Sequence, residues 1–162
     1  MKKTIKMMIG LLGLPIMLAS CNGMGGNSGN IVFSKSDSTS SEFCQKMDAS
    51  ENDSTPIYVT TFSVANRSGK AVTVSKDDFT VTIDGKTTSS YGIVDGWKFT
   101  AGTDGKKVYI TKRSDTTTID AIDENATVIT HPNVLVAFTV DFSSSTSYTF
   151  AYKGTTIKGL LE

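Results

Sequence analysis

Residue types that carry much of enzymatic and metal chemistry are scarce in this sequence. Histidine occurs once, as His131, and cysteine occurs twice, as Cys21 and Cys44. Structural zinc takes four nitrogen or sulfur ligands, which these residues cannot supply. The G-x-S-x-G turn that presents the nucleophile of many serine hydrolases does not occur. The sequence therefore argues against structural zinc and gives little support to a hydrolase.

An excess of charge of one sign and a long apolar run are also missing. Sixteen basic residues balance 16 acidic ones over 162 residues, whereas a nucleic-acid-binding protein presents a basic face. The apolar stretch at residues 7–19 is shorter than the roughly 20 residues that cross a bilayer. It also contains Gly10, Gly13 and Pro15, which weaken a helix. We therefore expect neither a nucleic-acid partner nor a membrane-spanning helix.

The same stretch has the layout of a secretory signal peptide. Three lysines precede it, at positions 2, 3 and 6, and the small residues Ala19 and Ser20 follow it. A basic start, a short apolar centre and a small-residue end are the three parts of such a peptide. We expect residues 1–20 to be removed from the mature protein.

The sequence LASC at residues 18–21 resembles the lipobox of bacterial lipoproteins. The resemblance implies that the thiol of Cys21 is joined to diacylglycerol and that the chain is cut just before this residue. An ordinary signal peptide, with Cys21 left as a thiol or in a disulfide, is the alternative. Each buried CH₂ group contributes roughly 0.8 kcal/mol, so two or three acyl chains anchor a protein firmly. We then expect the protein in the cell envelope, on the outer face of the cytoplasmic membrane or on an outer membrane.

Removal of the signal peptide leaves 142 residues, with 13 basic and 16 acidic side chains and a net charge of −3. This length fits one domain with a substantial core. Residues 21–30 are rich in Gly, Asn and Ser, which predicts a flexible tether. Residues 31–162 form the domain. Within it, residues 36–55 are predicted to be a long polar loop, with a short helix at residues 42–49 as a less supported alternative.

The second cysteine has no partner in the chain if Cys21 carries lipid. Exported proteins normally pair their cysteines in disulfides. Cys44 is therefore either buried beside Phe43 and inert or exposed and able to link two copies of the protein. Both interpretations stay open.

From residue 56 onward the sequence has the alternation of β-strands. Apolar residues alternate with other residues in DFTVTIDG (78–85) and in VLVAFTVDF (134–142), with Ala137, Thr139 and Asp141 expected on the opposite face of the latter. In YVTTFSV (58–64), Tyr58, Phe62 and Val64 are expected on one face. KVYITK (107–112) and SYTFAYK (147–153) are further short strands. NRSGK, IDGK, VDGW, TDGK and YKGT are predicted turns between them. Short strands at this spacing predict an all-β antiparallel sandwich.

The stretch TFSVANRSGKAVTVSKDDFTVTIDGK at residues 61–86 resembles the immunoprotective extracellular immunoglobulin-like domain of bacterial lipoproteins. The closing strands VLVAFTVDF and YTFAYKG are similar as well, so the resemblance spans roughly residues 31–158. It implies an immunoglobulin-like β-sandwich, in a family usually described as a domain of unknown function, and it implies no catalytic residues. The sequence departs from the family where His131-Pro132-Asn133 replaces a usual glycine.

Two groups of residues are candidates for binding. Tyr91 and Trp97 belong to YGIVDGWKF (91–99), where an aromatic ring can stack on a sugar or anchor a protein partner. A single tryptophan packed in the core of a sandwich is the alternative. Asp120, Asp123 and Glu124 are weak candidates for calcium because they lack the ordered ligand spacing of a calcium loop. A solvated acidic turn is the alternative there.

Three functions compete on this basis. The first is a non-enzymatic envelope lipoprotein whose sandwich binds a protein or a glycan. The second is a sensor of cations or small molecules at the membrane, and the third is an envelope hydrolase that uses His131. We expect the first, without cofactor or catalytic residues, because the fold is a common binding scaffold; this step rests on analogy between folds.

Overall fold

The computed structural model describes residues 26–28, 30–35, 45–103, 105–123, 125–126 and 131–159, and in these ranges the chain consists of strands and one 3₁₀ helix. The elements are β1 (Gly26–Ser28), β2 (Ile31–Lys35), β3 (Gln45–Ser50), β4 (Asp53–Asn66), β5 (Val72–Ser75), η1 (Lys76–Asp78), β6 (Phe79–Ile83), β7 (Lys86–Ser89), β8 (Gly92–Gly102), β9 (Gly105–Ser114), β10 (Thr116–Ile119), β11 (Asn133–Phe138), β12 (Tyr148–Tyr152) and β13 (Thr155–Thr156). The protein is therefore all-β, as the sequence predicts.

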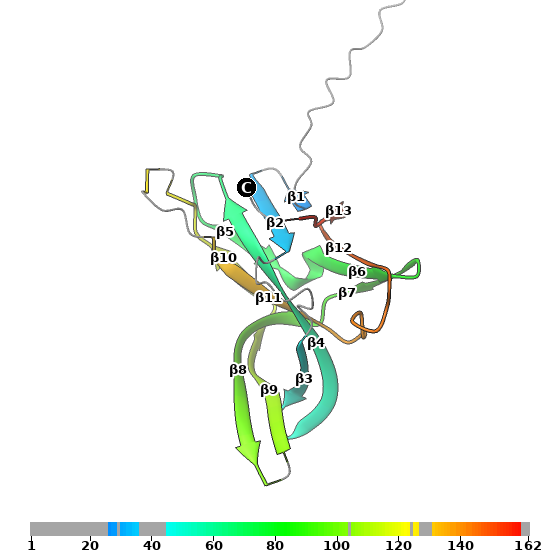
Figure 1. Ribbon diagram of the computed structural model, residues 1–162. Coiled ribbons are helices and arrows are strands. Elements are labelled where there is room, and N and C mark those ends of the chain that lie inside the picture. The colour runs from blue at the N-terminus through cyan, green and yellow to red at the C-terminus, as the bar shows by residue number, and fades with distance from the viewer. Residues whose placement is uncertain are drawn as a thin grey trace, which may run out of the picture.

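Two sheets pack against each other around the larger hydrophobic core (Figure 1). The first sheet has the order β1-β2-β4-β11-β8-β9-β3 and the second has the order β13-β12-β6-β7, while β5 and β10 form a separate pair. Both sheets contribute aromatic side chains to this core. Phe33 and Phe62 of the first sheet contact Phe79 of the second, with ring centroids 5.0 and 5.9 Å apart. The arrangement is sandwich-like.

The first sheet also closes into a ring at one end, because β3 pairs with both β4 and β9. The ring runs through β4, β11, β8, β9 and β3. Each of these strands sends at least one buried side chain into a second, smaller core: Met47, Ile57, Val59, Val94, Ile110 and Ala137. The protein thus has a sandwich core and a ring core that share three strands.

The 14-residue strand β4 serves both cores. Phe62 and Val64 lie in the sandwich core, and Tyr58 packs against it. Ile57 and Val59 lie in the ring core. Successive side chains of a strand point to opposite faces of the sheet, so one strand can fill both cores along its length.

The alternation predicted for two strands is confirmed. Phe79 and Val81 of β6 are buried in the sandwich core, as are Val134, Val136 and Phe138 of β11. Ala137, which we expected on a polar face, is also buried because the ring core covers that side of β11. The strand ends at Phe138, four residues earlier than predicted, and Phe142 reaches the core from the segment that follows.

Most of the predicted turns are present. Asp84 and Gly85 between β6 and β7 have φ of 49° and 79°, and Lys153 and Gly154 between β12 and β13 have 47° and 77°. Two consecutive residues with positive φ are typical of the type I′ turns that join hairpin strands. The turn predicted at VDGW is wrong, because Asp95 and Gly96 lie inside β8 at an irregularity of its pairing with β9.

The prediction of a polar loop over residues 36–55 is wrong from residue 45 onward. Gln45–Ser50 forms β3, and β4 begins at Asp53. The alternative helix at residues 42–49 is also wrong where the chain is described. QKMDAS has one large apolar residue, Met47, which is buried in the ring core. The small Ala49 packs against the same core, and the other side chains of the strand are polar. One large apolar residue and one alanine are too weak an alternation to predict a strand.

The start of β1 and the tip of the β8–β9 hairpin mark the two opposite ends of the domain (Figure 1). The signal peptide predicted for residues 1–20, the predicted acylation site at Cys21 and the thiol of Cys44 lie outside the described residues. Among the residues that are described, no helix is long and apolar enough to span a membrane.

Candidate functional site

The acidic turn after β10 does not gather charged groups in the part of the chain that is described. Asp120 and Asp123 are exposed, Glu124 lies outside the described residues, and no cluster of three potential metal ligands occurs among those described. Asp123 accepts a hydrogen bond of 2.9 Å from the backbone N–H of Asn125. This bond closes the turn on itself, so calcium binding at these residues stays a prediction.

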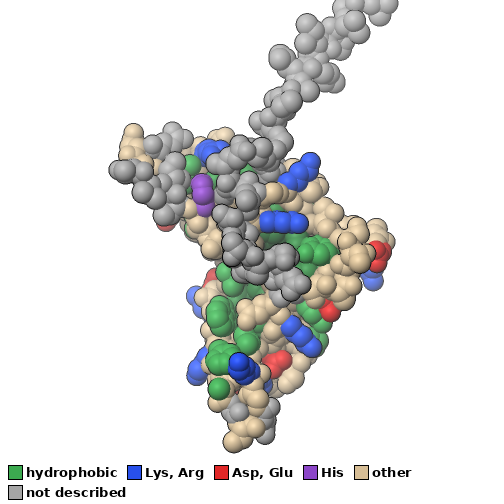
Figure 2. Space-filling view, viewed as in Figure 1, with side chains coloured by type: hydrophobic (Ala, Val, Ile, Leu, Met, Phe, Trp, Pro, Cys, Tyr) green, Lys and Arg blue, Asp and Glu red, His purple; other side chains and the backbone are tan. Residues whose placement is uncertain are grey.

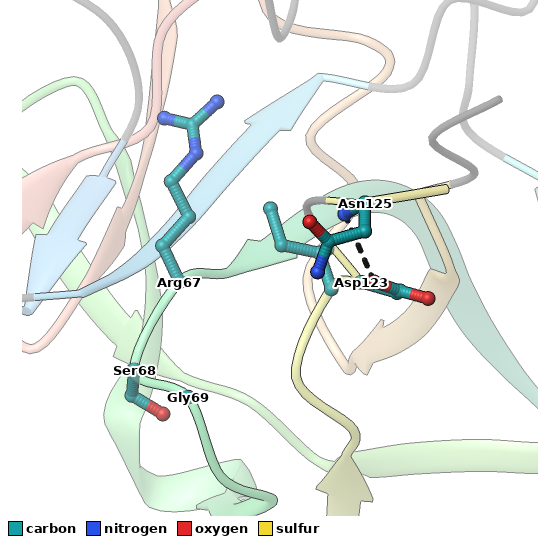
Figure 3. Close-up of a pocket in the computed structure, with 6 residues that line it drawn as sticks. Arg67, Ser68, Gly69, Asp123 and Asn125 are labelled. Atoms are coloured by element: carbon teal, nitrogen blue, oxygen red, sulfur yellow. Dashed lines mark hydrogen bonds between the residues drawn. The ribbon is translucent and has the colours of Figure 1, made fainter. Parts of the chain in front are cut away.

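A shallow hollow of about 410 Å³ lies beside this turn, lined by Arg67, Ser68, Gly69, Ile122, Asp123 and Asn125. Figure 3 shows that the guanidinium of Arg67 extends away from Asp123, so the two charges do not face a common point. Next to the hollow, the buried side chain of Asn66 donates hydrogen bonds to the carbonyls of Lys70 and Ile119, at 2.8 and 2.9 Å. They hold together the two segments that line the hollow. These bonds account for Asn66 as a structural residue.

Tyr91 supports the start of β8. The guanidinium of Arg113 lies 4.2 Å from the centroid of the Tyr91 ring, and its Nη1 atom donates to the Tyr91 carbonyl at 2.7 Å. The Arg113 side chain passes over Gly92, where an added Cβ would lie 2.5 Å from Cγ of Arg113. Arg113 therefore occupies a face of the Tyr91 ring, and Tyr91 packs on the ring core.

Trp97 and Phe99 are the two large apolar side chains of the described chain that remain exposed, at 49 and 48 % of their surface. In Figure 2, hydrophobic side chains gather along the lower left of the molecule, where Figure 1 places β8, with lysine or arginine side chains beside them. The alternative of a tryptophan packed in the sandwich core is therefore wrong. Single exposed apolar residues are ordinary. Trp97 and Phe99 stand two residues apart on one strand, which makes them the candidate binding surface of the described chain.

The register of the hairpin explains how the two rings come together. Trp97 lies opposite Ile110, and Phe99 lies opposite Val108. Opposed residues of an antiparallel pair share a face of the sheet. The side chains of Trp97 and Phe99 therefore lie on the face of the hairpin that carries the ring core. The rings stay uncovered because the neighbouring strand β11 pairs with β8 only at Gly92 and Ile93.

Two irregularities of pairing bend the hairpin away from β11. Val94 pairs with Arg113, Gly96 with Lys112, and Trp97 with Ile110, which leaves Asp95 and then Thr111 as extra residues. Such bulges bend a strand and increase its twist. Asp95 accepts hydrogen bonds at the bend from the hydroxyl of Ser114 and lies 3.7 Å from Nζ of Lys112.

On the side of the hairpin away from its open edge, Lys107 joins β9 to β3. Its Nζ atom lies 3.5 Å from a carboxylate oxygen of Asp48 in β3 and donates to the carbonyl of Glu51 at 2.6 Å. The same atom lies 5.9 Å from the ring centroid of Tyr109, which is buried. These contacts hold β9 against β3. The hairpin that carries Trp97 and Phe99 is therefore fixed to the rest of the domain along its β9 side.

The hairpin is basic although the chain from Cys21 onward is acidic overall. Residues 92–114 carry five basic and two acidic side chains, while the rest of the chain from Cys21 onward carries eight basic and 14 acidic ones. Lys98 and Lys106 are exposed and form no ion pair with any described residue. Lys98 and Lys106 thus place positive charge near Trp97 and Phe99 that no described carboxylate neutralises.

The groups whose pKa differs from its ordinary value lie outside the hairpin. Burial, reinforced by the charge of Asp78, raises the pKa of Tyr152 to about 12. Hydrogen bonds from Thr55 and from Ser143 lower the pKa of Asp53 and of Asp141. Both carboxylates are exposed and accept backbone N–H bonds from residues two positions further along the chain, so these pKa shifts follow from local hydrogen bonding. His131 is partly exposed, and its Nδ1 atom is buried without a described partner.

Sequence analysis identified Trp97 and missed Phe99. A signal was present in WKF at residues 97–99, where two aromatic residues occupy alternate positions around a lysine.

Comparisons with protein-family models, with curated proteins and with solved structures found no match for this chain.

Proposed function

We propose that this protein is a lipid-anchored lipoprotein of the bacterial cell envelope whose β-domain binds a partner without enzymatic activity. The observation that carries the proposal is the pair of half-exposed rings, Trp97 and Phe99, on one face of the β8–β9 hairpin. Aromatic residues are enriched among the side chains that dominate binding energy at protein interfaces, and they also stack on sugars.

The energy available from these rings is adequate for binding. A large aromatic side chain buries 150–250 Å², so covering the exposed half of both rings removes roughly 200 Å² of apolar surface from water. At about 25 cal/mol per Å² this amounts to roughly 5 kcal/mol. Association itself costs several kcal/mol, so the rings would serve as the anchor of a larger contact.

The order of the strands supports an immunoglobulin-like domain. β2-β4-β11-β8 in one sheet and β13-β12-β6-β7 in the other follow the order A-B-E-D and G-F-C-C′ of that fold. On this assignment β8 begins as strand D and continues into the hairpin, which is an addition to the basic sandwich. Folds of this class host many unrelated functions, so the binding proposal depends on the hairpin and not on the fold.

The position of the anchor favours display of the hairpin away from the membrane. Gly26, where β1 begins, is five residues beyond Cys21, and five residues span at most about 17 Å. The 14 residues of β4 run from the hairpin end to the β1 end and measure about 46 Å along the strand at 3.3 Å per residue. A lipid on Cys21 would therefore hold β1 near the bilayer and leave Trp97 and Phe99 at the distal end.

Photo-crosslinking in intact cells tests this proposal. Benzoylphenylalanine replaces Phe99, an aromatic residue of similar shape, and in a matched control it replaces Thr118, an exposed residue of β10. We expect a discrete adduct of higher mass from position 99 that is absent from position 118. Equal labelling at both positions, or no adduct at position 99, would show that the hairpin is not a binding surface.

A further inference from the structure

We propose that the partner adds a strand to the open edge of β8, and that this strand alternates apolar and acidic residues. The inference rests on the proposed function, because it takes the hairpin to be the binding surface. It specifies the chemistry of the partner and the mode of contact. Addition of an extended segment to a sheet edge is an established mode of peptide recognition.

The outer edge of β8 is open over most of its length. One edge of the strand pairs with β9 from Ile93 to Gly102. On its other edge, among the described residues, β8 pairs only at Gly92 and Ile93, with β11. The stretch 94–102 therefore presents backbone donors and acceptors that no described strand takes up, and Figure 1 shows it at the margin of the molecule.

The register tells which residues offer these groups. Gly102 pairs with Gly105 across a two-residue turn, and the residues next to such a turn form a hydrogen-bonded pair. In an antiparallel ladder hydrogen-bonded and non-hydrogen-bonded pairs alternate. Residues 98 and 100 therefore point their N–H and C=O groups at β9, and residues 97, 99 and 101 point theirs outward. Trp97 and Phe99 thus present both an aromatic side chain and outward-pointing N–H and C=O groups to an added strand.

The two faces of an added strand would meet different side chains. Trp97, Phe99 and Lys106 share one face, since Lys106 lies opposite Ala101. Lys98 lies on the other face, on which Tyr109 is its opposed residue. Side chains of neighbouring strands interact across a sheet. A strand with apolar residues toward the rings and acidic residues toward Lys98 fits both faces.

Charge selects this occupant over a second copy of the chain. Lys107 is bound to Asp48, and Lys112 is near Asp95, but Lys98 and Lys106 have no ion-pair partner among the described residues. Lysine on an open edge is a common protection against edge-to-edge pairing of two copies, and Lys98 is the lysine of this edge. Lys106 lies one strand away, on β9, and adds to the positive charge of the hairpin. Acidic residues on the Lys98 face of an added strand turn Lys98 into an attractive contact.

Peptide binding to the purified lipoprotein in detergent micelles tests the proposal. The probes are a nine-residue peptide of alternating valine and glutamate and the same peptide with lysine in place of glutamate. Trp97 is the sole tryptophan, so its emission reports directly on the hairpin. Hydrogen exchange measured by NMR at residues 97–101 reports on the backbone.

We expect the glutamate peptide to bind at least ten-fold more tightly than the lysine peptide and to shift Trp97 emission to shorter wavelength. Exchange should slow at residues 97, 99 and 101 and stay unchanged at 98 and 100. The variant Lys98→Glu, changed only at an exposed position, should reverse the preference between the two peptides. Phe99→Ser should weaken binding of the glutamate peptide at least ten-fold.

Contrary results separate this inference from the proposed function. Absence of peptide binding, or binding without alternate protection of the backbone, overturns strand addition. If anionic vesicles or an acidic polysaccharide shift Trp97 emission without that protection, the rings bind a surface or a glycan instead. A positive crosslink at position 99 beside any of these results leaves the proposed function intact. Alternate protection without a crosslink in cells supports strand addition and refutes the proposed function.

Discussion

Replacement of Phe79 by alanine tests the assignment of the sandwich core. The ring is fully buried, and its centroid lies 5.0, 5.1 and 5.9 Å from those of Phe33, Tyr152 and Phe62. Truncation of a buried phenylalanine typically costs about 3–5 kcal/mol, and three ring contacts place Phe79→Ala at the upper end. Since domains are stable by only about 5–15 kcal/mol, this variant should lose a third or more of its stability.

Urea denaturation followed by far-UV circular dichroism measures the loss. Thr80→Ala is the matched control, because Thr80 is the next residue of β6 and points to the opposite face. We expect the control to change stability by less than about 0.5 kcal/mol. Trp97 fluorescence, recorded in the same titration, should give the same midpoint as circular dichroism, since β4 belongs to both cores.

Two results would refute this reasoning. Similar small losses for Phe79→Ala and Thr80→Ala would mean that β6 faces the other way. A fluorescence midpoint well separated from that of circular dichroism would mean that the ring and the sandwich unfold independently, so that β4 does not couple them.

Four further predictions concern other parts of the chain. The raised pKa of Tyr152 adds stability that is complete below pH 10 and is lost as pH rises through about 12, so the unfolding free energy should fall more steeply between pH 10 and 12 in wild type than in Tyr152→Phe. Gly92→Ala should displace Arg113 and destabilise the domain by about 1–3 kcal/mol, as measured by denaturation, and an Arg113→Ala background should remove most of this cost. Mass spectrometry of the mature protein should find Cys21 at the N-terminus with acyl chains attached, whereas an unmodified Cys21 in a soluble chain would contradict the anchor. Under oxidising conditions wild type should form some disulfide-linked dimer that Cys44→Ser does not, and a thiol that resists maleimide until unfolding would place Cys44 in the interior instead.

Local pattern was sufficient to predict the sandwich half of the fold. Strands such as β6 have one buried face, so their sequences alternate, and Asp84-Gly85 has the chemistry of a hairpin turn. The ring was not predicted because it depends on pairing between distant segments. β3 has few apolar residues and forms by pairing with β4 and β9, and none of these contacts leaves a local period in the sequence.

The candidate site was predictable in part. The single Trp97 was identified from its residue type alone, but its exposure depends on where β11 stops pairing with β8. The Asp95-Gly96 pair has the composition of a turn and forms a bulge within a strand. Both outcomes depend on neighbouring strands, because a short stretch of sequence does not specify which strand lies beside it.

The path of β4 has a mechanical consequence. A load applied between a bound hairpin and a lipid-anchored N-terminus would act along the long axis of the domain, which β4 follows from one end to the other (Figure 1). β2, β3 and β11 pair with β4 along its sides, so the hydrogen bonds between them would be loaded together in shear and would not open one at a time. Forced unfolding depends on the rate of barrier crossing and not on equilibrium stability. Under such a load, the pairing of β4 with three other strands would make the domain resist tension.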